Sequence, residues 1–190
     1  NQMTFGYDWV DLDNTLNVKD NHGTAVTSCI GTYDPGKYIG SAPNANFVLF
    51  RTENGKTENP IEELNWCKAA EVADSLGVDI ITSSLGYNQY DDPSLSYTHR
   101  SLDGATSFIS LGASTAVQKG IFVLNSAGNE GDDKWFKIGT PADVPTVLTI
   151  GAIDRKGKIG RFSSKGPNAD GVVKPDVCAL GVRAAVASSY

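Results

Sequence analysis

Short apolar runs alternate with amphipathic stretches along this chain, and the alternation predicts the order of its elements. Strands are expected at residues 5–12, 46–51, 78–86, 120–125 and 145–153, which alternate or form apolar runs. Apolar positions three and four residues apart predict helices at residues 22–31, 61–76 and 104–119. Strands and helices that take turns along a chain predict an α/β domain with a largely parallel sheet.

The helix expected over residues 61–76 has signals at both ends. Asn59 is a candidate N-cap, Pro60 suits the first helical position, and Glu62 completes a capping box. Gly77 is placed to end the helix, because glycine readily adopts the left-handed conformation found after a helix. The predicted buried face of this helix consists of Ile61, Leu64, Val72 and Leu76.

The earlier helix opens on a histidine. Asp20 and Asn21 precede His22 as candidate N-caps. Its buried side is expected to comprise Ala25, Val26, Cys29 and Ile30. The helix would fix the imidazole, and Gly23 would leave room beside it for another chain. Since neutral imidazole accepts a proton near pH 7, His22 is a candidate general base. An ordinary capping or core histidine is the alternative.

The composition is that of one globular domain, taken to span residues 1–190. Hydrophobic residues make up 40% of the chain and charged residues 20%, enough for a core and a solvated surface. The net charge of −6 argues against a nucleic-acid-binding protein, which would need a basic face. No apolar run is long enough to span a bilayer. The three cysteines form no C-x-x-C pair, so a zinc site is not expected.

Two later segments follow apolar strands, at the edge where parallel sheets bind ligands. The segment Ser84–Gly86 has little bulk at its end, so an extended peptide could pair with its backbone. Asn129 follows the next strand, and its amide can donate a hydrogen bond into a cleft. Together with a histidine, such a donor fits acyl transfer: one group takes a proton and the other stabilises charge on a carbonyl oxygen. A plain turn asparagine is the alternative.

Two polar loops contain enough oxygen atoms to hold a cation. The first runs from Asp11 to Asn17 and the second from Asp91 to Asp103. The first lacks the spacing of an established calcium loop, so a solvated turn is favoured there. His99 in the second loop is a candidate second catalytic histidine, but a surface position is favoured because helix context is lacking.

Six motifs in a fixed order resemble those of the subtilisin-like serine proteases, or subtilases. They are residues 22–26 (HGTAV), 40–45 (GSAPNA), 77–86 (GVDIITSSLG), 126–129 (SAGN), 162–167 (FSSKGP) and 174–181 (KPDVCALG). Each motif is weak alone, but six in the family's order are highly specific. The resemblance covers the chain from about Phe5 to Gly181.

The resemblance implies a fold and a role for each matched residue. It implies a three-layer α/β/α fold with a largely parallel sheet, truncated at both ends. His22 would be the general base and Asn129 the donor to the oxyanion. The backbone of Ser84, Leu85 and Gly86 would pair with a polypeptide substrate. Part of the pocket for the side chain before the scissile bond would be formed by Ser126, Ala127 and Gly128.

Two motifs of the family are absent from this sequence. Neither the aspartate that orients the histidine nor the Gly-Thr-Ser motif that carries the nucleophile is found. The chain is therefore interpreted as the central, partial peptidase domain of a serine endopeptidase, and it is expected to be inactive alone. The alternative is a non-catalytic subtilase-like module that binds peptides or partner proteins.

The resemblance also bears on cofactors, partners and location. It implies no required cofactor, although the family often binds structural calcium, for which the two polar loops are the candidates. The partners it implies are a polypeptide substrate and the remaining segments of the protein's own precursor. It further implies secretion or a place in the cell envelope.

Overall fold

The computed structural model describes residues 3–16 and 21–187. The chain forms two compact units, each of which is described by itself. The first unit comprises Asn1–Gly55 with Ala184–Tyr190, and the second comprises Lys56–Arg183. No helix in the described part of the chain has the length and apolarity needed to cross a membrane.

The first unit contains a pair of parallel strands, a small hairpin and one helix. Its elements are β1 (Met3–Asp8), α1 (His22–Gly31), β2 (Tyr33–Asp34), β3 (Tyr38–Ile39) and β4 (Phe47–Arg51). β1 pairs with β4 in parallel, and β2 pairs with β3 antiparallel. The strand predicted at residues 5–12 lies earlier than expected, because β1 ends at Asp8 and the chain turns there.

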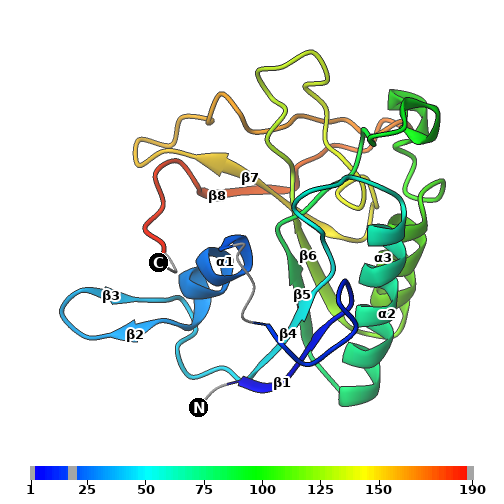
Figure 1. Cartoon of the computed structure of the whole chain (residues 1–190). Coiled ribbons are helices and arrows are strands. Elements are labelled where there is room, and N and C mark those ends of the chain that lie inside the picture. Colours follow the sequence, from blue (N-terminus) through cyan, green and yellow to red (C-terminus); the bar gives the residue numbers. More distant parts are fainter. Residues whose placement is uncertain (1–2, 17–20, 188–190) are drawn as a thin grey trace. The chain divides into compact units, whose positions relative to one another are not determined.

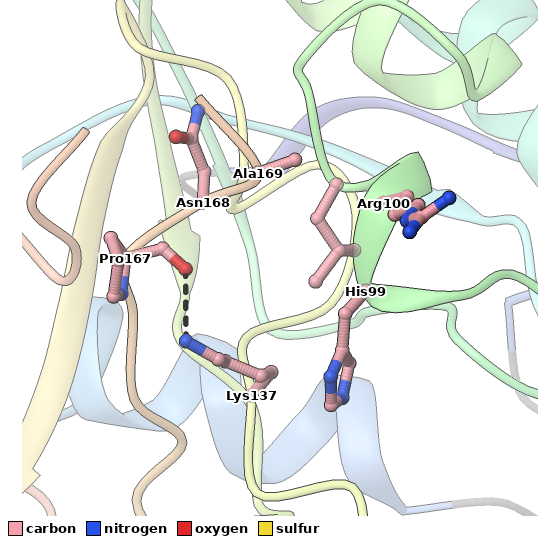
Figure 2. Close-up of a pocket in the computed structure, with 7 residues that line it drawn as sticks. His99, Arg100, Lys137, Pro167, Asn168 and Ala169 are labelled. Atoms are coloured by element: carbon pink, nitrogen blue, oxygen red, sulfur yellow. Dashed lines mark hydrogen bonds between the residues drawn. The ribbon is translucent and has the colours of Figure 1, made fainter. Parts of the chain in front are cut away.

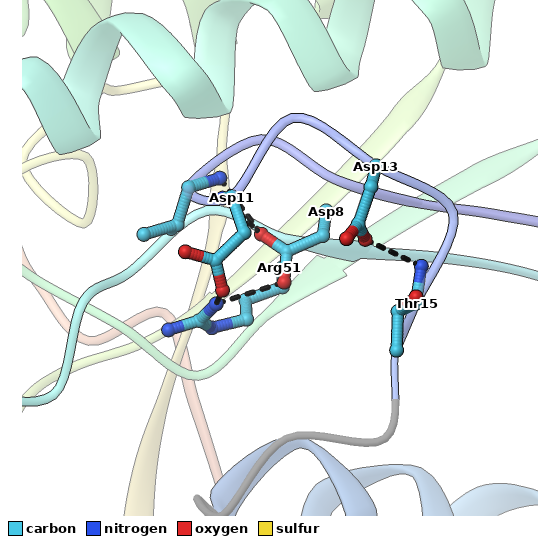
Figure 3. A network of polar contacts seen from close by, with 6 residues as sticks. Asp8, Asp11, Asp13, Thr15 and Arg51 are labelled. Carbon is cyan, nitrogen blue, oxygen red and sulfur yellow. Dashed lines mark hydrogen bonds and ion pairs between the residues drawn. The ribbon is translucent and has the colours of Figure 1, made fainter.

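Asp8 explains where β1 ends. Its carboxylate is fully buried and accepts hydrogen bonds from the backbone amides of Val10 and Asp11, which closes a turn. Its other oxygen lies 2.8 Å from Nη1 of Arg51, and the same nitrogen lies 2.8 Å from Asp11 (Figure 3). The alternating pattern continues past Asp8, but these polar contacts stop the strand there.

Helix α1 begins and ends where the sequence predicts, but its environment differs. Of its residues only Ser28 is buried, whereas the predicted apolar side is half-buried. Asn21 occupies the N-cap position without a side-chain hydrogen bond to the helix. Asp20, the other capping candidate, lies outside the described residues. The prediction that the Asn21 side chain caps the helix is therefore wrong. The prediction that the apolar side is buried is met only in part, because those residues are half-buried.

The second unit is built on a four-stranded parallel sheet. Its strands are β5 (Ile80–Ser83), β6 (Phe122–Ser126), β7 (Leu148–Ile153) and β8 (Val177–Leu180), in that order. Helices α2 (Ile61–Leu76) and α3 (Phe108–Gln118) lie side by side next to this sheet (Figure 1). A core that includes Trp66, Ile109 and Val123 fills the space between helices and sheet. This arrangement confirms the predicted α/β class.

The opposite face of this sheet is open in the second unit. Ile80 and Phe122 are register partners on β5 and β6, and both side chains are more than half exposed. Continuous apolar strands are typical of sheets covered on both faces. Within the described residues of the second unit, however, helices cover one face only.

Helix α2 ends at Gly77 as predicted, but its N-cap is Pro60 rather than Asn59, and its buried face is not the predicted one. Oδ1 of Asn59 accepts a hydrogen bond from the Ile61 amide, and Gly77 adopts a φ of 72° after the helix. The apolar residues Ile61, Leu64 and Leu76 are exposed. The buried residues are Glu62, Glu63, Trp66, Ala69, Ala70 and Ala73. The helix is thus rotated from the predicted orientation, because small side chains allow close packing and two buried glutamates find polar partners.

The segment after β5 is more buried than a polar loop. It contains two short 3-10 helices, η1 (Pro93–Leu95) and η2 (His99–Ser101). Tyr87, Tyr90 and Leu102 are buried in it. Most of the polar residues of this segment lie at the exposed positions between these three buried side chains. The following helix α3 begins at Phe108, later than predicted, and Phe108 itself points to solvent.

Candidate active site

His22 is the first residue of α1, as the sequence predicts. Its Nδ1 lies 3.9 Å from a carboxylate oxygen of Glu53, the residue two positions after β4. The imidazole is about half exposed, with 53% of its side-chain surface accessible. Apart from its chain neighbours and its own helix backbone, no atom of the described residues lies within 4 Å of the place where a Cβ on Gly23 would stand. An accessible imidazole on a helix terminus, with a carboxylate near Nδ1, is suited to proton transfer.

Ser84–Gly86 directly follows β5, which ends at Ser83 rather than continuing to Gly86 as predicted. The next residue, Tyr87, holds the C-terminal end of this segment in place. It exchanges two backbone hydrogen bonds with Thr140, each 3.0 Å long. The Leu85 carbonyl oxygen accepts a hydrogen bond of 2.9 Å from the side chain of Asn125. The segment is therefore held from two neighbouring parts of the second unit.

Residues 126–129 leave β6 in a tightly fixed conformation. The Ala127 amide donates to the Ile150 carbonyl, and the Gly128 carbonyl accepts from the Ser164 amide. Gly128 has a φ of 106°, and a Cβ there would clash with the Glu130 carboxylate, so glycine is required. Asn129 follows and is exposed. Its amide is thus accessible to a ligand.

The strand register places these two segments at one edge of the sheet. Ser83, the last residue of β5, is the register partner of Asn125 on β6. Ser84–Gly86 and residues 126–129 therefore leave adjacent parallel strands at almost the same level. His22 belongs to the first unit, whereas both of these segments belong to the second.

The acidic loops considered for calcium use their carboxylates differently. Asp92 accepts hydrogen bonds from Ser94, and Asp103 accepts from Ala105 and Thr106. Asp11 pairs with Arg51, and Asn17 lies outside the described residues. Within residues 3–16 and 21–187, no three acidic, histidine or cysteine side chains are grouped as metal ligands. The described residues therefore do not fit a calcium site.

A recess of about 230 Å³ lies elsewhere on the second unit (Figure 2). It is lined by His99, Arg100, Leu102, Lys137, Pro167, Asn168 and Ala169. The Lys137 ammonium donates to the Gly166 and Pro167 carbonyls, and Nε2 of His99 lies 3.1 Å from the Trp135 carbonyl. These basic groups thus bind the backbone that builds the recess. His99 is exposed, which confirms the predicted surface position.

The sequence of the chain matches known proteins over nearly its whole length. A model described as the subtilase family matches residues 3–190. The chain belongs to the subtilase family.

Individual relatives agree with this assignment. Serine protease AprX of Bacillus subtilis is 32% identical over 96% of this subtilase chain and 40% of its own length. The major intracellular serine protease of the same organism is 27% identical, over 90% of the chain and 50% of its own length. The solved structure of a cold-adapted subtilisin-like serine proteinase superposes with a TM-score of 0.69 at 23% identity, covering 95% of this chain and 56% of that one. The chain thus spans about half or less of these relatives.

Two buried residues, Asn125 and Glu63, form hydrogen bonds to the chain around Ser84–Gly86 that the sequence did not predict. Asn125 bonds the Leu85 segment, and Glu63 on α2 binds Tyr90 and Tyr97 of the segment that follows. Asn125 is a polar residue at the end of an apolar strand, and that contrast is a usable signal. Glu63 looks like an ordinary surface glutamate of a helix, and no local pattern distinguishes it.

Proposed function

We propose that the complete protein is a serine endopeptidase that hydrolyses peptide bonds through an acyl-enzyme. The observation that carries this proposal is the family match over residues 3–190, which includes the segments of His22 and Asn129. The accessible position of both side chains supports it. This chain would supply the base and the oxyanion donor, and a segment outside it would supply the serine.

Each residue would act at a defined step. The His22 imidazole takes the proton of the serine hydroxyl as the oxygen attacks the scissile carbonyl, and then passes this proton to the leaving amine. The Asn129 amide donates a hydrogen bond to the carbonyl oxygen as it gains negative charge. Backbone pairing along Ser84–Gly86 aligns the polypeptide, and residues 126–128 contact the side chain before the scissile bond.

A second candidate is a non-catalytic module that binds peptides at the Ser84–Gly86 segment. The observation in its favour is that the Ser84–Gly86 segment is held in place from two sides, by Asn125 and by the Tyr87–Thr140 backbone pair, and could therefore bind a peptide without catalysis. It predicts peptide binding without turnover, whereas the peptidase predicts covalent modification of a serine.

The test uses the whole protein that the gene encodes. It is treated with a fluorophosphonate probe for activated serines and assayed on a peptide amide substrate. His22→Ala is expected to abolish hydrolysis and labelling. Asn129→Ala is expected to lower kcat about 100- to 1000-fold, a range taken from subtilisin itself. The chain has one other histidine, so His99→Ala is the matched control and should retain activity.

Wild-type protein that binds peptide but neither hydrolyses nor labels would favour the binding module. Hydrolysis that survives His22→Ala would refute the role of this histidine. Secretion or a cell-envelope location remains a proposal, since the relatives include a protease named as intracellular. Binding to the remaining segments of the protein's own precursor is likewise a proposal.

A further inference from the structure

The helix-covered face of the sheet changes from apolar to polar at the level where β5 ends. Ser83, Asn125 and Thr149 are register partners across β5, β6 and β7, and all three are buried. Val123, two residues earlier on β6, belongs to the apolar core. Buried polar side chains are unfavourable unless they form hydrogen bonds, so each member of this row needs a partner.

Each polar side chain of the row finds a different partner. Ser83 accepts a hydrogen bond of 2.8 Å from the Trp66 indole. Thr149 donates one of 2.8 Å to the Ala142 carbonyl. Asn125 alone of the three contacts both segments that leave the sheet edge at the candidate site.

Asn125 uses both hydrogens of its amide nitrogen. Nδ2 lies 2.9 Å from the Leu85 carbonyl oxygen and 2.9 Å from the Ser126 carbonyl oxygen. Carbonyl oxygens only accept hydrogen bonds, so the atom that faces both must be the nitrogen. The side chain is 1% exposed, so water does not compete for these bonds. One rigid amide thus links the segment after β5 to the end of β6.

We propose that Asn125 is a positioning residue that sets the spacing between the peptide-pairing segment Ser84–Gly86 and the segment 126–129 that ends in Asn129. This inference rests on the proposed function, in which one segment aligns the substrate and the other stabilises the oxyanion. Asn125 touches neither substrate nor reacting atoms. It acts by keeping the scissile carbonyl in register with Asn129.

The chemistry of the side chain makes the claim specific. Alanine removes both hydrogen bonds and leaves two carbonyls without a donor. Serine can donate only one hydrogen bond, with a shorter reach. Aspartate keeps the shape, but its oxygens would face two carbonyl oxygens and repel them. The expected order of kcat/KM is therefore wild type, Asn125→Ser, Asn125→Ala and Asn125→Asp, from highest to lowest.

A matched control lies in the same row. Thr149→Val removes one buried hydrogen bond at the same level of the sheet, but its partner Ala142 belongs to neither segment. Both Asn125→Ala and Thr149→Val are expected to lower the melting temperature. Only Asn125→Ala should also lower kcat/KM about 10- to 100-fold, mainly through kcat, because small misplacements of reacting groups are costly.

The assays use the whole encoded protein at a temperature where circular dichroism shows each variant folded. A loss of kcat/KM in Asn125→Ala that Thr149→Val matches would overturn the proposal, since both would then report stability alone. If the wild-type protein proves inactive, the proposed peptidase function fails. The positioning role of Asn125 is then tested by calorimetric binding of a peptide amide. Weaker binding by Asn125→Ala than by Thr149→Val supports positioning, and equal binding overturns it.

Discussion

Oε1 of Glu63 accepts a hydrogen bond of 2.6 Å from the phenol of Tyr97, across 34 residues of sequence. The same oxygen accepts from Tyr90, and Oε2 accepts from the Ile109 amide at 2.9 Å. Glu63 is fully buried and forms no ion pair with the basic residues described in the structure. Three neutral donors therefore stabilise one buried carboxylate, and they tie α2 to the segment after Gly86 and to the start of α3.

Replacing Glu63 should test how much this junction stabilises the fold. Glu63→Leu would leave three buried donors without an acceptor and should lower the free energy of unfolding by about 3–5 kcal/mol. Glu63→Gln keeps one acceptor and should lose less. Glu71→Gln on the exposed side of the same helix is the control and should change stability by less than about 0.5 kcal/mol. Urea unfolding measures all three, and a small effect of Glu63→Leu would contradict the junction.

The two tyrosines bound to Glu63 should resist ionisation. Burial raises the pKa of both Tyr90 and Tyr97 above the ordinary value of 10, and the hydrogen bond to Glu63 raises the pKa further. Because the unfolded phenols ionise near 10, this stabilisation is complete below pH 10 and is lost as the pH rises above it. A spectrophotometric titration should show these tyrosines ionising only on unfolding. Normal titration of Tyr90 and Tyr97, identified by phenylalanine variants, would refute this.

The sequence predicted the elements better than their orientations. The spacing of apolar residues located α2, and Gly77 marked its C-terminal end correctly. The prediction of the buried face was wrong. Periodicity counts Ile61 and Leu64 as apolar, but it does not show that Glu63 accepts hydrogen bonds from three donors in distant segments. Partners that lie dozens of residues away leave no trace in a local pattern.

At the candidate site, too, local motifs were found in the sequence, whereas contacts between distant segments were not. The motif positions predict roles for His22 and Asn129, which stay predictions, and the structure shows both residues exposed, His22 at the start of α1 and Asn129 three residues after β6. The contact of Asn125 could not be predicted, because its hydrogen bond to Leu85 depends on the register between two strands. Strand register is a property of the tertiary structure. The sequence therefore shows the motif, but not the hydrogen bonds from neighbouring strands that hold the motif in place.

Calcium removal should leave stability unchanged. The carboxylates of Asp92 and Asp103 already accept hydrogen bonds from nearby backbone amides, and Asp11 pairs with Arg51. Calcium takes about six to eight oxygen ligands, and within the described residues no three acidic, histidine or cysteine side chains are grouped to supply them. The melting temperature should therefore be equal in EDTA and in millimolar calcium, with magnesium as the control for ionic strength. A calcium-specific rise in the melting temperature would show a site that the described residues do not form.

Asp143 should make stability depend on pH in the mildly acidic range. Burial raises its pKa from 3.8 to about 6, although Ser110 and the Gly104 amide donate hydrogen bonds to it. Asp103 nearby raises the pKa further. Since the folded state holds the proton more tightly, the contribution is present below pH 4 and is lost as the pH rises through 6. Its size is at most about 3 kcal/mol.

Asp143→Asn isolates this contribution. The amide cannot ionise, so the difference in unfolding free energy between variant and wild type should change between pH 4 and pH 6 and stay constant above about pH 7. Asp154→Asn, which removes a carboxylate from an unrelated turn, serves as the control for loss of an acidic group. Parallel curves for Asp143→Asn and wild type would refute the raised pKa.

Asp8 and Asp11 bind the same nitrogen of Arg51 but differ in burial, which allows a matched comparison. The Asp8 side chain is 1% exposed and that of Asp11 is 62% exposed. Asp8→Asn removes the charge of a buried acceptor, although Arg51 keeps its pair with Asp11, so it should cost about 1–3 kcal/mol. Asp11→Asn breaks an exposed pair and should cost less than about 1 kcal/mol.

The pH dependence provides an independent check of this pair. Burial alone would raise the pKa of Asp8, but the hydrogen bond from Arg51 and those from the Asp11 and Val10 amides outweigh it and hold the pKa below its ordinary value. Its stabilisation is therefore present above about pH 4 and is lost as the pH falls below that. Urea unfolding from pH 7 down to pH 3 should show the cost of Asp8→Asn shrinking toward acid. Equal costs for the two variants at pH 7 would mean that burial does not strengthen this ion pair.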